Sequence, residues 1–169
     1  DAELVYEAIR RAQPGGLGRA SAHDVHGDPP KDLCRAMALA AEVDAVARQF
    51  VNGFDDVCGA LVTWLRSCLA RGLDLLEAVS EVQLRWLAER GDGLIVRKVG
   101  HELSAEAQRL AEVALDEWLE TGQRGAHWQA LDGFLRADGH RRNPGTTADL
   151  IAAALFVLLI THTPDASTK

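Results

Sequence analysis

The stretch from residue 146 to residue 160 has the sequence TTADLIAAALFVLLI and is apolar on almost every side of a helix. Its apolar run is about 14 residues long, whereas a helix needs about 20 residues to cross a membrane. An apolar helix of this length is typical of the centre of a helical bundle. We therefore predict a helix that starts at Thr146 and is buried in the core. The alternative is an interface within a homo-oligomer, and we expect no membrane association.

The rest of the chain shows the same helical periodicity. Apolar residues recur three or four positions apart over residues 2–12, 33–50, 57–69, 75–88, 104–120 and 128–137. The sequence PGGLG at residues 14–18 predicts a loop after the first helix. Residues 94–100 are rich in β-branched side chains but too few and too isolated to build a sheet, so we expect a bend or a helical turn there.

These patterns predict an all-α protein, a compact bundle of about seven helices with a buried apolar C-terminal helix. Residues 1–169 are enough to bury a core, and we expect them to form a single helical domain. The sequence starts with Asp1 rather than Met, and the helical repeat of apolar residues is already under way from Ala2. This start favours a fragment or a processed product.

The composition is that of an acidic globular protein. The chain has 18 Lys and Arg residues against 25 Asp and Glu residues, a net charge of −7, and 47% of its residues are hydrophobic. This balance excludes disorder of the whole chain, and the negative surface repels nucleic acid and anionic lipid. We expect no nucleic-acid partner, and any site for a polyanion has to be local.

The three cysteines, Cys34, Cys58 and Cys68, lie within apolar helical patterns and are odd in number. Buried thiols of a reducing compartment fit this arrangement better than a disulfide framework does. We therefore expect the protein to be cytoplasmic.

The turn Asn143–Gly145 leads into the last predicted helix and is the most informative candidate site. Thr146 can cap the helix, and Asp149 can complete a capping box. The free N–H groups of the first turn, next to Arg141 and Arg142, would suit a phosphate. Asp149 would repel that phosphate unless a divalent cation such as Mg²⁺ bridged the two. The alternative is a capped, buried helix start with solvated arginines.

Two further groups of charged residues have both a structural and a functional interpretation. Arg97 and Lys98, with His101, form a local positive cluster or are simply solvated charges at a helix boundary. Asp44 and Arg48 are four residues apart on the predicted helix 33–50, a spacing typical of a surface ion pair.

Asp55 and Asp56 open the next predicted helix. Acidic residues at this position interact favourably with the helix dipole, and we expect that role. Ligation of Mg²⁺ is the alternative.

Several sequence motifs occur in an order that resembles one enzyme family. They are YEAIRRA at residues 6–12 with PGGLG, the segment from Asp44 through ARQF to Asp55-Asp56-Val57, LIVRKVG at residues 94–100, and NPGTTADLIAAALF at residues 143–156. Together they resemble the triphosphoribosyl-dephospho-CoA synthases, which make the prosthetic-group precursor of citrate lyase and malonate decarboxylase. Members of this family are commonly longer, so we expect the chain to be the C-terminal part of a longer family protein.

The resemblance implies that the substrates are ATP and dephospho-CoA. The triphosphoribosyl group of ATP would move to the 2′-hydroxyl of dephospho-CoA, adenine would leave, and Mg²⁺ would accompany the nucleotide. Such a substitution at an anomeric carbon needs a carboxylate near the developing positive charge and a proton for the leaving base.

The resemblance also implies roles for particular residues. Asp149 and Asp44 would be catalytic, and Asp149 and Asp56 would ligate the metal. The substrate-binding residues would be Arg48, Arg97, Lys98, Asn143, Gly145, Thr146 and Thr147.

The sequence departs from the family pattern at two places. It has Asn143-Pro144-Gly145-Thr146-Thr147 where citrate lyase synthases have Ser-Pro-Gly-Gly-Ser, and Asp92-Gly93-Leu94 where they have Asp-Thr-Asn. A related acceptor is therefore possible. The alternative function is a non-catalytic helical module that binds a nucleotide, CoA or another protein.

Overall fold

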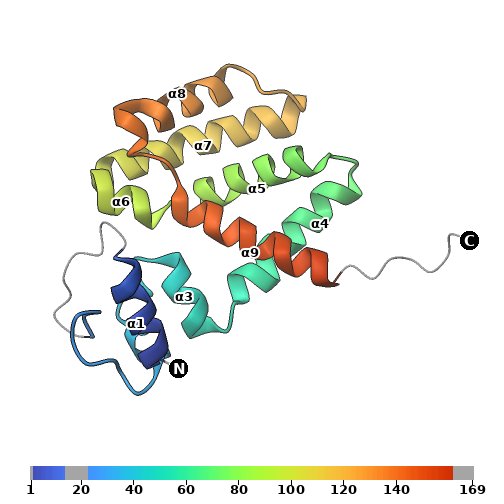
Figure 1. Ribbon diagram of the computed structural model, residues 1–169. Coiled ribbons are helices and arrows are strands. Elements are labelled where there is room, and N and C mark those ends of the chain that lie inside the picture. Colours follow the sequence, from blue (N-terminus) through green and yellow to red (C-terminus); the bar gives the residue numbers. More distant parts are fainter. Residues whose placement is uncertain (1, 14–22, 162–169) are drawn as a thin grey trace, which may run out of the picture.

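The computed structural model describes residues 2–13 and 23–161 (Figure 1). All regular structure in these residues is helical, which confirms the all-α prediction. The elements are α1 (Ala2–Ala12), α2 (Leu33–Ala38), α3 (Ala45–Asn52), the π-helical segment η1 (Asp56–Leu61), α4 (Val62–Ala70), α5 (Leu75–Arg90), α6 (Gly93–Val99), α7 (His101–Thr121), α8 (Ala126–His140) and α9 (Gly145–Thr161). The loop predicted at residues 14–18 lies outside the described residues.

Helix α5 lies between two hydrophobic clusters and is apolar on both sides. Its Val82 and Trp86 belong to a cluster with η1, α4 and α9, whereas Leu84 and Leu87 belong to a second cluster with α6, α7 and α8. Figure 1 shows α7 and α8 on one side of α5, and α4 and α9 on the other. The two-sided burial of α5 therefore joins both halves of the bundle.

Helix α9 is buried along one face only. Leu150, Ile151 and Ala154 pack into the first cluster, as the prediction of a core helix requires. On the opposite face and toward the end of the helix, Phe156 and Leu159 keep 62% and 73% of their surface exposed. In the described part of the chain, no single helix is long and apolar enough to cross a membrane, and α8 and α9 meet that criterion only as a pair bent by 113°.

The prediction of one continuous helix over residues 33–50 is wrong. The helix ends after Ala38, and Asp44 starts a new one with extended backbone angles and a side chain that accepts hydrogen bonds from the N–H groups of Val46 (2.8 Å) and Ala47 (3.2 Å). The apolar spacing runs on across this break, so periodicity gave no sign of it.

The segment 94–100 is the short helix α6, in line with the expected helical turn. Its cap is Asp92, whose Oδ1 accepts hydrogen bonds from the N–H groups of Leu94 (2.8 Å) and Ile95 (3.3 Å). The Oδ2 atom accepts two more, from the backbone N (2.7 Å) and the Oγ1 (2.8 Å) of Thr147. One buried carboxylate thus caps α6 and the start of α9 together.

The capping box predicted for Thr146 and Asp149 is therefore wrong. Helix α9 begins at Gly145, which places Thr146 inside its first turn, and the acceptor for the first-turn N–H of Thr147 comes from Asp92. Asp149 is exposed on the outer face of the helix. A carboxylate from a different part of the chain replaces the local cap.

A second buried carboxylate, Glu81, ties α5 to α4 and α7. It accepts hydrogen bonds from the indole N–H of Trp118 (2.9 Å) and the Sγ of Cys68 (3.3 Å), and it forms an ion pair with Arg71 (2.5 Å). Burial acts to raise the pKa of Glu81, but the hydrogen bonds from Trp118 and Arg71 outweigh it and hold the pKa below its ordinary value. Glu81 is therefore ionised in the folded protein at neutral pH.

The burial predicted for the cysteines holds for Cys68 alone. Burial and the neighbouring Glu81 raise the pKa of its thiol. Cys34 and Cys58 are exposed free thiols, because the faces of the helices that carry them point away from the core. The prediction of three buried cysteines is corrected accordingly.

Replacing Asp92 with alanine is expected to destabilise the protein by about 3 kcal/mol, because it removes the acceptor for two helix starts and leaves the buried N–H of Thr147 unpaired. Urea unfolding measures the change. The matched control is Asp74→Ala, which removes an exposed cap from α5 and is expected to cost about 1 kcal/mol. Equal losses in the two variants would contradict the double role of Asp92.

Glu81→Gln is expected to lower the free energy of unfolding at pH 7 by about 2 kcal/mol. Because the folded pKa of Glu81 is depressed, its contribution is fully present above the ordinary carboxyl pKa and is lost as the pH falls through the folded pKa. The difference between the wild type and Glu81→Gln should therefore shrink as unfolding is measured at pH 7, 5 and 3.

The control for this measurement is Glu89→Gln, which removes an exposed ion pair with Arg85 and should change stability by less than about 0.5 kcal/mol. A stability difference for Glu81→Gln that stays constant with pH would show that the carboxylate charge of Glu81 is not the stabilising feature.

Candidate functional site

A cavity of about 750 Å³ lies where the segment before α3, the end of α5, α6 and the start of α7 meet. Its apolar wall includes Val43, Leu94 and Val96. The charged and titratable residues that line it are Glu42, Asp44, Arg48, Arg90, Asp92, Arg97 and His101. The cavity therefore combines basic and acidic side chains beside an apolar surface, a combination typical of small-molecule sites.

The starts of four helices converge on this cavity. Its lining includes Asp44 and Ala45 of α3, Asp92 and Gly93 of α6, His101 of α7 and Thr146 of α9. The N-terminal end of a helix carries a partial positive charge, which favours anionic ligands.

Two glycines make this convergence possible. A Cβ atom on Gly93 would collide with the backbone carbonyl of Val43, and a Cβ on Gly145 would come within 2.5 Å of Leu94 Cδ2. Gly93 therefore lets the start of α6 touch the segment before α3, and Gly145 lets α9 approach α6.

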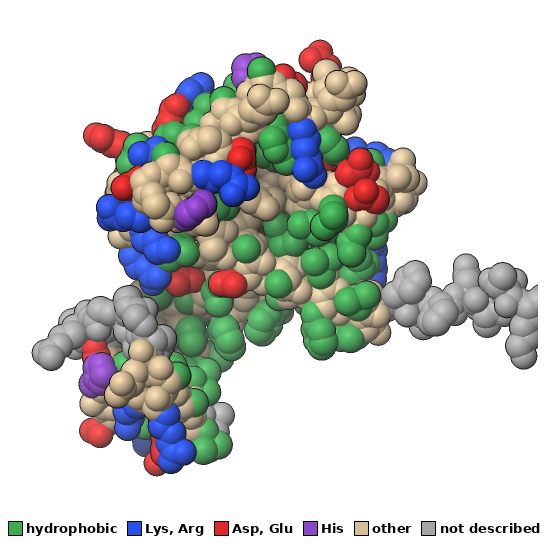
Figure 2. All heavy atoms as spheres, turned by 45° about the horizontal axis from the view of Figure 1, so that its top comes forward, with side chains coloured by type: hydrophobic (Ala, Val, Ile, Leu, Met, Phe, Trp, Pro, Cys, Tyr) green, Lys and Arg blue, Asp and Glu red, His purple; other side chains and the backbone are tan. Residues whose placement is uncertain are grey.

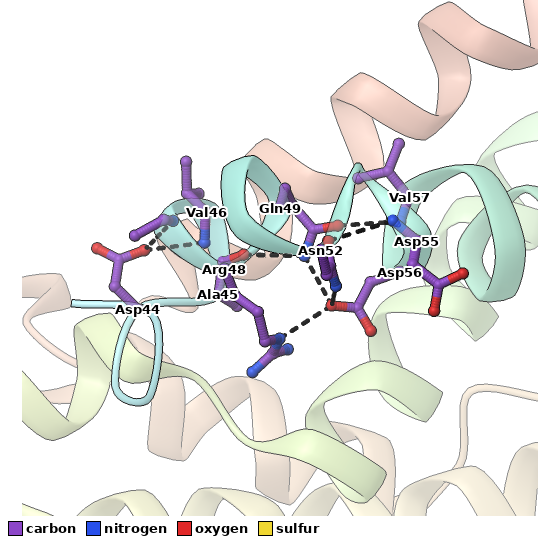
Figure 3. A network of polar contacts seen from close by, with 10 residues as sticks. Asp44, Ala45, Val46, Arg48, Gln49, Asn52, Asp55, Asp56 and Val57 are labelled. Atoms are coloured by element: carbon purple, nitrogen blue, oxygen red, sulfur yellow. Dashed lines mark hydrogen bonds and ion pairs between the residues drawn. The ribbon is translucent and has the colours of Figure 1, made fainter. Parts of the chain in front are cut away.

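The carboxylates of the cavity differ in their remaining capacity to accept hydrogen bonds. Both oxygens of Asp92 are occupied by donors of α6 and α9. In Asp44, Oδ1 accepts both capping hydrogen bonds, while Oδ2 makes none with the described residues (Figure 3). Asp44 thus keeps one oxygen free to meet a ligand, and Glu42, which also lines the cavity, makes no hydrogen bond with the described residues.

Arg48 pairs with Asp56 and not with Asp44, so the predicted ion pair between Asp44 and Arg48 is not formed. The Nε of Arg48 donates to Asp56 Oδ2 at 3.0 Å (Figure 3). The same oxygen accepts hydrogen bonds from the side-chain amides of Gln49 (2.7 Å) and Asn52 (3.4 Å).

Asp55 and Asp56 open η1 as predicted, with Asp56 in its first turn, but the expected side-chain cap is not formed. Asp55 makes no side-chain capping bond, and the carboxylate of Asp56 is buried against α3. Burial acts to raise the pKa of Asp56, but hydrogen bonds from Gln49 and Arg48 hold it below its ordinary value. In residues 2–13 and 23–161, no group of three or more His, Cys, Asp or Glu side chains is arranged to hold a metal ion.

The structure separates the remaining predicted site residues into two sets. Arg97 and Thr146 line the cavity together with Asp44 and Arg48. The residues that do not contribute to its lining are Asp56, Lys98, Asn143, Gly145, Thr147 and Asp149. Among these, Gly145 and Thr147 contact residues of the lining: Gly145 packs against Leu94, and Thr147 donates a hydrogen bond to Asp92.

Arg141 and Arg142, which precede α9, do not line the cavity either. Arg141 donates to the backbone carbonyl of Lys98 at 2.8 Å, and the guanidinium of Arg142 stacks 4.5 Å above the ring of Phe134. The arginines that line the cavity are instead Arg48, Arg90 and Arg97.

Sequence reasoning missed Glu42, Arg90 and Asp92. Arg90 looks like an ordinary basic helix end, and Glu42 lies in what was taken for a continuous helix. A signal for Asp92 exists, because Arg90-Gly91-Asp92-Gly93 places an Asp-Gly helix start directly after a helix end.

Comparisons with known proteins identify a family. The family model CitG, described as ATP:dephospho-CoA triphosphoribosyl transferase, matches residues 1–167. Neither a search of curated proteins nor a search of solved structures gave a match. Family membership indicates a transferase, and it implies ATP and dephospho-CoA as the substrates. Because the match covers nearly the whole sequence, the chain belongs to the ATP:dephospho-CoA triphosphoribosyl transferase family.

Proposed function

We propose that the chain transfers the triphosphoribosyl group of ATP to dephospho-CoA, or to a closely related hydroxyl acceptor, in the cavity at the starts of α3, α6 and α9. The observation that carries this proposal is the meeting of Asp44, with its free carboxylate oxygen, and three arginines in one cavity. Its volume of about 750 Å³ lies within the range typical of ligand pockets.

The reaction breaks the bond between the ribose anomeric carbon and adenine and forms a bond from that carbon to the acceptor hydroxyl oxygen. The hydroxyl loses its proton, and the leaving base takes one up. Positive charge develops on the ribose in the transition state. The free oxygen of Asp44 stabilises that charge, and His101, which also lines the cavity, places an imidazole beside it for proton transfer.

The triphosphate needs positive groups that reach it. Arg97 and Arg90 are exposed on the cavity wall, and Arg48 is half-buried beside them. Their guanidinium groups can form charge-assisted hydrogen bonds with phosphate oxygens. A Mg²⁺ ion that arrived with ATP would neutralise further phosphate charge, and the cavity carboxylates that keep oxygens open to it are Glu42 and Asp44.

We assign the catalytic carboxylate role to Asp44 instead of sharing it with Asp149. Asp149 is exposed on α9 and outside the lining of the cavity, whereas Asp44 borders the cavity beside Arg48. The role first expected for Asp56 as a metal ligand is likewise unsupported, because its Oδ2 is surrounded by three hydrogen-bond donors.

Incubation of the protein with ATP, Mg²⁺ and dephospho-CoA is expected to release adenine and to add the triphosphoribosyl mass to dephospho-CoA. Chromatography detects the base, and mass spectrometry detects the product. A panel of other hydroxyl acceptors, run in parallel, tests the altered-acceptor alternative. Calorimetric binding of both substrates without adenine release would instead support a non-catalytic binding module.

Asp44→Asn is expected to lower kcat about 10²- to 10⁴-fold, because the amide cannot stabilise the positive charge or accept a proton. Asparagine is as good a helix cap as aspartate, so α3 and the fold should be retained. The matched control is Asp149→Asn, which should leave kcat near that of the wild type. If Asp149→Asn abolished turnover and Asp44→Asn did not, the catalytic role would belong to Asp149.

A further inference from the structure

The buried carboxylate of Asp56 lies behind the cavity and is connected to it through a single side chain, Arg48. We propose that Asp56 is a positioning residue: it holds the Nε of Arg48 so that the two terminal nitrogens of the guanidinium stay available to the triphosphate in the cavity. This inference rests on the proposed function, and it names the residue that orients one of the phosphate-binding arginines.

The hydrogen bonds of Arg48 show which of its atoms are used. Its Nε donates to Asp56, and Nη1 and Nη2 make no hydrogen bond with the residues that the structure describes. An arginine that serves only as an ion-pair partner commonly binds a carboxylate with two parallel hydrogen bonds. Here one bond fixes the direction of the side chain and leaves the outer edge of the guanidinium free for an anion.

Asp56 is itself held rigidly. Gln49, with 1% of its surface exposed, donates from Nε2 to Asp56 Oδ2 (2.7 Å) and to the carbonyl of Ala45 (2.9 Å). Its Oε1 accepts the N–H of Val57 at 3.3 Å, so both ends of the amide are occupied (Figure 3). The orientation of the carboxylate is therefore set by α3 and by the first turn of η1.

The turn between α3 and η1 brings Asp56 back toward Arg48. Gly53 and Phe54 both adopt left-handed backbone angles, with φ of 71° and 63°. Such a conformation is unfavourable for a bulky residue such as phenylalanine. The ring of Phe54 packs 5.4 Å from that of Phe50, which compensates part of the strain.

A charge in this position is difficult to explain by stability alone. The Arg48 side chain is 33% exposed and the Asp56 side chain 11%, so the pair removes a carboxylate from water while its partner stays partly hydrated. Buried ion pairs of this kind contribute little net stability compared with apolar residues of the same size. A role in orienting the arginine at the cavity explains why the carboxylate is placed there.

The test measures binding of inorganic tripolyphosphate to the full chain by calorimetry, with turnover of ATP as a second readout. In Asp56→Asn we expect tripolyphosphate affinity to fall about tenfold, because Arg48 is no longer held by a charged acceptor. The KM for ATP should rise by a similar factor while kcat changes little. The control is Asp55→Asn, which alters the exposed neighbour of Asp56 and should bind tripolyphosphate as the wild type does.

A double-mutant cycle separates positioning from a general structural effect. If Asp56 acts through Arg48, the double variant Arg48→Ala with Asp56→Asn should bind tripolyphosphate as weakly as Arg48→Ala alone. Additive losses would overturn the proposal, and so would wild-type affinity in Asp56→Asn or a wild-type protein that fails to bind tripolyphosphate.

Arg48→Lys provides a test that does not depend on the folding of Asp56→Asn. Lysine has a single terminal nitrogen, which cannot both bind Asp56 and reach a phosphate in the cavity. We therefore expect about tenfold weaker tripolyphosphate binding in this variant. Wild-type affinity in Arg48→Lys would overturn the proposal. Tripolyphosphate binding that depends on Asp56, in a protein that releases no adenine, would contradict the proposed function and leave the positioning role intact.

Discussion

The buried carboxylate of Asp92 is the interaction on which the architecture around the cavity depends. Its two oxygens accept hydrogen bonds from the starts of α6 and α9. Asp92 and Thr147, which form the bond to α9, are 55 residues apart in the sequence. The first-turn N–H groups of a helix need acceptors, and burial makes an unpaired one costly. By supplying both helices, Asp92 fixes α9 against the end of α5 and so forms one corner of the cavity.

The bundle uses acidic side chains from neighbouring helices at two further places. Glu117 of α7 accepts the N–H groups of His127 (3.0 Å) and Trp128 (3.4 Å) at the start of α8, and Gly125 leaves room for its carboxylate. Glu81 joins α4, α5 and α7 in the interior. Buried or capping carboxylates thus fix how the helices pack, which the apolar contacts alone would leave less specific. On the outer face drawn in Figure 2, hydrophobic and charged side chains lie next to one another.

The acidic residues near the cavity have different tasks, and their hydrogen bonds distinguish these tasks. Both oxygens of Asp92 accept hydrogen bonds from the protein, and Asp56 accepts three on Oδ2 and lies outside the cavity lining, so each acts on the structure around it. Asp44 caps α3 with one oxygen and keeps the other free at the cavity. Although the chain has a net charge of −7, three of its arginines line one cavity, a local arrangement that would suit the triphosphate of the proposed reaction.

Most of the helices and the family resemblance were predictable from the sequence, because helical periodicity and short motifs are local properties of the chain. The predicted helices at residues 2–12 and 75–88 agree closely with α1 and α5, and Asp44, Arg48, Arg97 and Thr146 do line one cavity. The break before Asp44 was hidden, since the apolar spacing continues through it. Which carboxylate meets which donor, as in Asp92 with Thr147 or Asp56 with Arg48, depended on the packing of helices and on the strained turn at Phe54. Long-range packing also left one face of α9 exposed, although its composition is apolar all round, because only one of its sides meets the core.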